Sequence, residues 1–195
     1  MRKSLTMASV AVLATSLAAC SSTGGRKAVE EASNNAGHAN TPTMTVALVT
    51  HSGPGDTFWD IVRKGAEDAA AKDNVKLEYT ANPEGAQQAN LVQQAVDKKV
   101  DGIAVTLAKP EAMKGNVEKA VGADIPVVAL NAGMNEWKDM GALSFFGQFD
   151  EVAGEAAGER LTEEKAGKTL CVIQEQGHVG LESRCKGVAA TFDKS

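Results

Sequence analysis

Short runs of apolar residues alternate along the chain with longer segments in which apolar residues recur every three or four positions. A continuous apolar run predicts a buried strand, alternation predicts a strand with one less buried face, and the helical spacing predicts an amphipathic helix. Strands are accordingly expected over 46–49, 75–79, 103–105, 127–130, 143–147 and 169–173. Helices are expected over 58–69, 89–96, 113–121, 150–161 and 180–192.

This order of elements predicts the fold class. Strands that alternate with helices form βαβ units in a mostly parallel sheet, and each crossover is expected to be right-handed. Continuous apolar strands fit such a sheet, because helices cover both of its faces. We therefore expect an α/β fold built on a doubly wound parallel sheet.

Composition narrows the class of protein. The chain has 195 residues, of which 43% are hydrophobic and 23% charged, as in an ordinary globular protein. The formal net charge of −5 argues against a nucleic-acid partner, because such proteins normally carry a basic patch.

The first residues predict export. Arg2 and Lys3 precede an uncharged stretch over 8–19, which is typical of a signal peptide and too short to span a bilayer as a stable helix. The stretch ends Leu-Ala-Ala-Cys, which resembles the bacterial lipobox, so residues 1–19 are expected to be removed and Cys20 to carry a lipid. An ordinary signal peptide with an incidental cysteine is the alternative. Residues 20–42 are rich in small polar residues and predict a flexible tether.

Ligand chemistry is expected where the strands end. In open α/β sheets, ligands bind beyond the carboxyl ends of the strands, which selects the loops 50–59, 107–110 and 131–135. Phe58 and Trp59 are adjacent, so both cannot point into a helix–sheet core, and one is expected to offer an aromatic face to a sugar ring. The alternative is that Phe58 is a core residue and Trp59 an incidental surface ring.

Two polar residues in these loops are further candidates. Asp56 is a possible ligand contact, although it or Thr57 can also cap the helix, since Thr57 and Asp60 match a capping box. Asn131 carries donor and acceptor groups that suit hydroxyl recognition, or it is a turn residue ahead of Gly133.

No motif for catalysis, metal binding or a cofactor is evident. The first loop has two glycines of a dinucleotide fingerprint, but Phe58 stands at the third position. His51 and His178 are far apart in the sequence without metal-ligand spacing, and His178 is expected to be exposed or a minor ligand contact. We therefore expect no enzyme activity, no cofactor and no metal.

The three cysteines can be assigned. With Cys20 lipidated, Cys171 and Cys185 remain in an oxidising compartment, where a disulfide between them is expected. Two separate thiols are the alternative.

Several segments together resemble a known family. The lipobox, the loop ending at Trp59, the turn 81–83 and the segments 99–105 and 123–131 are similar to those of the type 1 periplasmic binding proteins. In particular, they resemble sugar-binding lipoproteins of bacterial ABC importers such as ribose-binding protein, over residues 43–193.

The resemblance implies two α/β lobes that close on a sugar. It places the N-terminal lobe at 43–147 and the start of a second lobe at 148–195, with the rest of that lobe beyond the end of this chain. It implies ligand contacts by Asp56, Phe58, Trp59, Asn131 and Arg184. The family often has an Asp-Arg pair where this sequence has Asn131-Ala132, so the usual charged clamp of this lobe is missing.

The leading hypothesis is a non-catalytic, lipid-anchored, extracytoplasmic protein that captures a sugar for an ABC transporter permease. The alternative is a receptor domain of the same fold that senses a sugar or an autoinducer-2-like ligand for a signalling partner. A secreted α/β enzyme is a third hypothesis, without a recognisable nucleophile to support it. A sugar-responsive repressor would need a DNA-binding segment where this chain has the lipoprotein signal.

Overall fold

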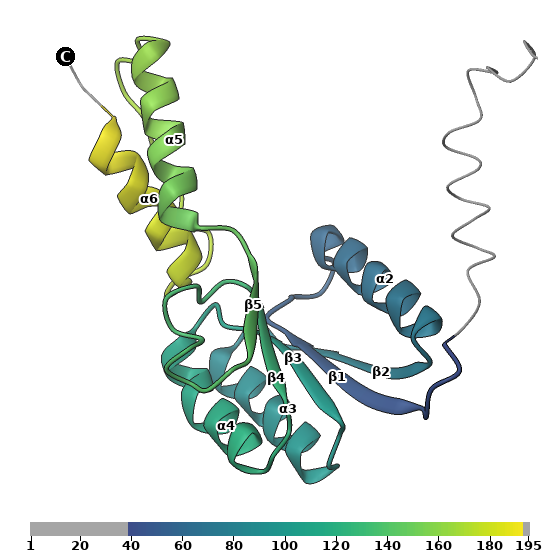
Figure 1. The fold of residues 1–195 in the computed structure, drawn as a ribbon. Coiled ribbons are helices and arrows are strands. Elements are labelled where there is room, and N and C mark those ends of the chain that lie inside the picture. Colours follow the sequence, from purple (N-terminus) through teal and green to yellow (C-terminus); the bar gives the residue numbers. More distant parts are fainter. Residues whose placement is uncertain (1–38, 193–195) are drawn as a thin grey trace, which may run out of the picture. The chain divides into compact units, whose positions relative to one another are not determined.

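A single parallel sheet organises the chain in the computed structural model, which describes residues 39–192. Its strands are β1 (Met44–Thr50), β2 (Val75–Ala81), β3 (Gly102–Thr106), β4 (Val127–Asn131) and β5 (Ser144–Gly147). They lie in the order β2-β1-β3-β4-β5, with every neighbouring pair parallel (Figure 1). The expected α/β fold with a parallel sheet is therefore confirmed.

Helices lie on both faces of the sheet, as the continuous apolar strands predicted. The helices against the sheet are α2 (Thr57–Lys72), α3 (Gly85–Asp97) and α4 (Pro110–Gly122). Two further helices, α5 (Asp150–Glu163) and α6 (Val179–Thr191), pack mainly on one another. Figure 1 shows α3 and α4 on one face of the sheet and α2 on the other.

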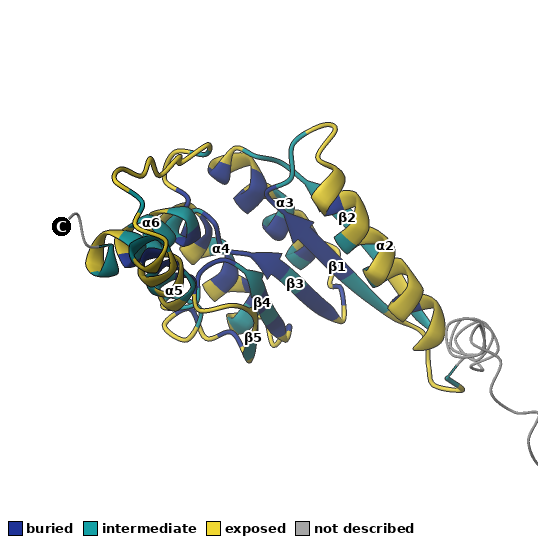
Figure 2. Cartoon of the chain, turned by 90° about the horizontal axis from the view of Figure 1, so that it is seen from above, coloured by how far each residue is buried: buried dark blue, intermediate teal, exposed yellow. Residues whose placement is uncertain are grey.

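The two faces of the sheet are covered unequally. Alternate strand residues such as Val49, Val105 and Ala129 are fully buried with α3 and α4 in the main core. Their neighbours along the strands, among them Leu48 and Val128, line an apolar groove beside α2. Figure 2 shows buried strands at the centre and a largely exposed α2. The main core of the described chain therefore lies between the sheet and the α3–α4 layer.

The start of α2 is fixed by a side-chain cap. Asp56 Oδ1 accepts hydrogen bonds from the backbone amides of Phe58 (3.1 Å) and Trp59 (3.4 Å). These bonds satisfy two of the amides that a helix start leaves without an internal partner. Asp56 is therefore the N-cap, and the capping box expected between Thr57 and Asp60 is not used.

Helices α5 and α6 pack closely on one another (Figure 1). A side chain at Gly154 would collide with the backbone of Arg184, and one at Gly187 with the backbone of Glu151. The contact between the two helices therefore depends on glycine on both of them.

The expected strand over 169–173 is wrong. This segment forms no strand in the described part of the chain, and Leu170 and Val172 remain 85% and 66% exposed. Its apolar pattern suits a strand, but a strand needs a neighbour, and the one sheet described ends at β5. The segment is instead held by the disulfide between Cys171 and Cys185, which joins it to α6 as expected.

The expected signal peptide over 1–19, Cys20 and most of the expected tether lie outside the described residues. Among residues 39–192, no helix combines the length and the apolar character needed to cross a membrane.

Candidate functional site

Polar residues gather at the carboxyl edge of the sheet. Parallel strands end at a shared edge, so the residues that follow β1, β3 and β4 are neighbours in space although they are distant in sequence. His51 follows β1, Thr106 ends β3, and Asn131 ends β4. Both His51 (7% exposed) and Thr106 (0%) are buried there.

The hydroxyl of Thr106 connects three elements. Its Oγ1 accepts hydrogen bonds from the backbone amide of His51 (3.1 Å) and from Nε2 of Gln88 on α3 (2.9 Å), and it lies 2.8 Å from His51 Nδ1. Gln88 Nε2 also donates to the Thr106 carbonyl (2.9 Å), which fixes which end of the amide faces the strand. The His51 ring is thus anchored to β3 and, through Thr106, to α3.

The two adjacent aromatic rings have opposite environments. Trp59 is 4% exposed and packs edge-to-face on His51, with ring centroids 5.0 Å apart. Phe58 is 55% exposed and contacts Trp59 edge-to-face at 5.2 Å. The alternative of a core Phe58 and a surface Trp59 is therefore wrong, and Phe58 is the ring left open to solvent. Trp59 is the buried ring, packed against His51.

The segment before α6 returns to this edge. The Val179 amide donates a hydrogen bond to the carbonyl of Ala108, in the loop after β3 (3.0 Å). Glu175 lies beside the same loop, with Oε1 3.2 Å from Lys109 Nζ and Oε2 3.9 Å from His51 Nε2. Residues from the expected start of the second lobe therefore contact residues that follow β1 and β3.

His178 is buried rather than exposed, which corrects the expectation from sequence. It is the N-cap of α6, where its Nδ1 accepts a hydrogen bond from the Leu181 amide (3.3 Å). Its ring lies edge-to-face against His51, with centroids 5.0 Å apart. Sequence reasoning placed His178 in a polar loop and missed this contact. The available signal was its position immediately before a helical apolar pattern, which is where helix caps occur.

Burial governs the charge of both imidazoles. It lowers the pKa of His51 from 6.5 to about 4, an effect that the nearby Glu175 opposes and that His178 and Lys109 reinforce. Burial also lowers the pKa of His178, again partly opposed by Glu175. The two rings are therefore neutral at pH 7, and their hydrogen bonds depend on which nitrogen carries the proton.

His51, Glu175 and His178 bring their ligand-type atoms within 4.8 Å of one another. These residue types are also those that bind transition metals. In each ring, however, Nδ1 already lies in a hydrogen bond, to Thr106 or from Leu181. These hydrogen bonds therefore limit what the cluster can bind.

Three other residues were expected at the site, and two of them have structural partners of their own. Asp56 uses Oδ1 to cap α2. Arg184 Nε donates to Asp150 Oδ1 (2.6 Å), and that buried carboxylate also accepts a hydrogen bond from Gln148 Nε2 (2.9 Å). Asn131 has a left-handed backbone (φ 68°) at the end of β4. The structure thus places Arg184 in an ion pair on α6, with 43% of its side chain exposed.

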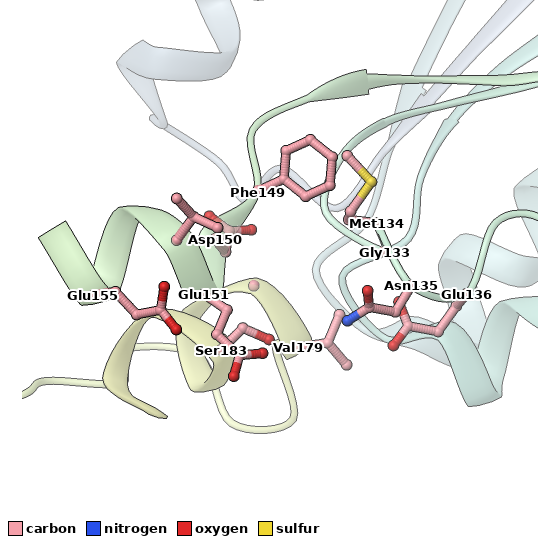
Figure 3. Close-up of a pocket in the computed structure, with 12 residues that line it drawn as sticks. Gly133, Met134, Asn135, Glu136, Phe149, Asp150, Glu151, Glu155, Val179 and Ser183 are labelled. Carbon is pink, nitrogen blue, oxygen red and sulfur yellow. The ribbon is translucent and has the colours of Figure 1, made fainter. Parts of the chain in front are cut away.

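A separate pocket of about 210 Å³ lies beside the start of α5 and α6. Figure 3 shows side chains from the loop after β4, from α5 and from α6 around it, with the carboxylates of Glu136, Asp150, Glu151 and Glu155 among them. None of the five expected ligand residues lines this pocket. Its carboxylates disfavour an anionic ligand.

Comparison with protein families gives a match over most of the chain. Residues 46–195 match the family model described as a periplasmic binding protein domain. Among proteins with curated descriptions, none matches this sequence.

Solved structures give close matches. A carbohydrate transporter from Acidothermus cellulolyticus, in complex with myo-inositol, is 57% identical with a TM-score of 0.76, over 78% of this chain and 53% of that one. A periplasmic sugar-binding protein of an ABC sugar transporter from Legionella pneumophila is 27% identical, with a TM-score of 0.70, over 76% and 56% of the two chains. A sugar-binding protein of a sugar ABC transporter from Bacillus halodurans is 28% identical, with a TM-score of 0.61, over 77% and 50%. This chain therefore spans about half the length of the structures that it matches.

The depressed pKa of His51 predicts a pH dependence of stability. The unfolded chain takes up a proton at His51 near pH 6.5, whereas the folded chain does so only near pH 4. The free energy of unfolding should therefore fall as the pH is lowered from 6.5 to 4, by up to about 3 kcal/mol from this group. In His51→Gln this part of the fall should disappear. Urea denaturation across this pH range measures the free energy of unfolding of both proteins. The same pH dependence in the two proteins would contradict the prediction.

Proposed function

This chain belongs to the periplasmic binding protein domain family, and from that premise we propose that it binds a sugar or a cyclic polyol at the carboxyl edge of its sheet, without catalysing a reaction. The observation that carries the proposal is the set of polar side chains at that edge, where the buried His51 and Thr106 meet the partly exposed Lys109 and Glu175. The relative that is 57% identical was solved with myo-inositol, which supports the same class of ligand.

The chemistry of this edge suits a ligand rich in hydroxyl groups. Such a ligand needs hydrogen-bond donors and acceptors around its rim and an apolar surface for its C–H face. Neutral imidazole and carboxylate groups provide the hydrogen-bond donors and acceptors, and the exposed ring of Phe58 provides the apolar surface. Asn131, Asp56 and Arg184 complete the proposed site from the end of β4, the start of α2 and α6.

Roles for these three residues follow from the partners that they already have. Asp56 Oδ1 already accepts hydrogen bonds from two backbone amides at the start of α2. A ligand can therefore use only the remaining acceptor capacity of this carboxylate. Arg184 is oriented by Asp150 through Nε, so the outer edge of its guanidinium is left for a hydroxyl. Asn131 has no charge, and a site with Asn131 suits an uncharged ligand.

We further propose that the protein acts outside the cytoplasmic membrane, held there by a lipid on Cys20, and delivers its ligand to an ABC transporter permease. The basic start, the apolar stretch and the Leu-Ala-Ala-Cys sequence support the anchor. The Legionella and Bacillus matches, both described as sugar-binding proteins of ABC sugar transporters, support the partner.

Ligand binding can be tested at Phe58. Replacing Phe58 with Ala should weaken the affinity for myo-inositol by up to about tenfold, the scale of one aromatic contact. Ile61→Ala is the matched control, because Ile61 lies one turn along the same helix and is 74% exposed. Titration calorimetry against myo-inositol and a panel of pentoses and hexoses measures both. If the two substitutions changed the affinity equally, Phe58 would not be a ligand contact. If the unsubstituted chain bound no compound of the panel, sugar binding would be refuted.

The anchor can be tested at Cys20. In a bacterial host, Cys20→Ala should abolish incorporation of radiolabelled palmitate and move the protein from the membrane fraction to the soluble fraction. Ser21→Ala is the control, because it leaves the cysteine in place. Unchanged labelling of Cys20→Ala would contradict the proposal.

A further inference from the structure

The cluster of His51, Glu175 and His178 was not expected from the sequence, and its hydrogen bonds carry an inference about the ligand. The three side chains come from the loop after β1 and from the segment before α6, and both imidazoles are buried. What the cluster can bind depends on whether its free imidazole nitrogens carry lone pairs, as in a metal site, or N–H groups.

Counting hydrogen bonds at Thr106 fixes the tautomer of His51. The hydroxyl oxygen has two lone pairs, and these are taken by the N–H groups of His51 and Gln88. The remaining contact of the hydroxyl is His51 Nδ1 at 2.8 Å, so the hydroxyl proton is donated to Nδ1. Because the neutral ring has one proton, that proton is on Nε2. Gln88 and Thr106 therefore act as positioning residues that hold His51 as an Nε2–H donor.

The same count applies to His178. Its Nδ1 accepts the Leu181 amide, so the neutral ring again carries its proton on Nε2. A metal ion would need an unprotonated nitrogen, and freeing Nε2 in either ring would place a proton on Nδ1 against a hydrogen bond that already exists. The donor set does not fit a transition metal. The two rings present N–H groups, and that of His51 faces the Glu175 carboxylate.

The space between His51 and Glu175 fits one oxygen atom. His51 Nε2 and Glu175 Oε2 are 3.9 Å apart, too far for a direct hydrogen bond. One oxygen about 2.8 Å from each atom spans that distance with an angle near 90° at the oxygen, by simple triangle geometry. A hydroxyl there can accept from Nε2–H and donate to Oε2. The ion pair with Lys109, itself bonded to the Pro83 carbonyl, holds the carboxylate in position.

We propose, on the basis of the function proposed above, that His51 and Glu175 together bind one hydroxyl group of the ligand. The hydroxyl accepts a hydrogen bond from His51 Nε2–H and donates one to Glu175 Oε2. The pair therefore selects a sugar or cyclic polyol with a free hydroxyl at this position and rejects one that is deoxygenated there. Since the two residues come from opposite ends of the described chain, the same hydroxyl also joins the segment before α6 to the loop after β1.

The first experiment tests the tautomer without any ligand. In the full chain labelled with ¹⁵N at histidine, long-range ¹H–¹⁵N correlation spectra at pH 7 should show Nε2 as the protonated nitrogen of His51. Thr106→Ser should preserve this pattern, because it keeps the hydroxyl, and Thr106→Val should lose it. A proton on Nδ1 of His51 in the unsubstituted chain would overturn the proposal.

The second experiment tests the hydroxyl with a double-mutant cycle between protein and ligand. The probes are myo-inositol and each of its monodeoxy derivatives, and the variants are His51→Phe, which keeps a ring against Trp59, and Glu175→Gln, whose side chain is partly exposed. One monodeoxy derivative should bind the unsubstituted chain at least tenfold more weakly than myo-inositol does, and that difference should shrink to less than threefold in either variant. Circular dichroism checks that the variants are folded.

The outcomes separate this inference from the proposed function. If myo-inositol binds but every deoxy effect is unchanged in both variants, the hydroxyl pair is wrong and sugar binding stands. If neither myo-inositol nor the sugar panel binds, the proposed function fails and the hydroxyl pair fails with it, whereas the tautomer result still reports on the Thr106 network.

Discussion

The common direction of the strands is the constraint on which this structure depends. Because all neighbouring strands are parallel, their carboxyl ends meet at one edge, and residues that follow β1, β3 and β4 become neighbours there. The helices must return the chain across the sheet, and α3 and α4 supply the apolar side chains that bury one face. Polar groups at the edge are buried by the same packing, so each of them needs a partner. The Thr106 hydroxyl is such a partner for the backbone amide of His51 and for Nε2 of Gln88.

Much of the fold could be predicted from periodicity, because strands buried between helices have continuous apolar runs whatever their neighbours are. The strand expected over 169–173 is the exception. Leu170 and Val172 have the right pattern, but strand formation depends on a partner that a local pattern does not report. The disulfide to Cys185 holds that segment instead.

The site was predictable in its location and less so in its residues. The rule on carboxyl ends selected the loops after β1, β3 and β4, and the structure brings residues of the first two together with Glu175. The sequence does not decide which of Phe58 and Trp59 is buried, because either ring can be the buried one until the cap at Asp56 sets where α2 begins. The contact between His51 and His178 could not be predicted, since it depends on how the segment before α6 docks on the loop after β3. Arg184 was selected by resemblance alone, and the resemblance did not indicate its ion pair with Asp150.

Binding of a sugar or cyclic polyol at the carboxyl edge of the sheet is tested most directly by titrating the ¹⁵N-labelled chain with myo-inositol and following the amide chemical shifts. We expect saturable shifts at residues 51–59, 106–109 and 174–179, with residues 97–101 and 123–125 at the opposite edge unchanged. Shifts confined to the opposite edge, or no saturable shift at all, would contradict it.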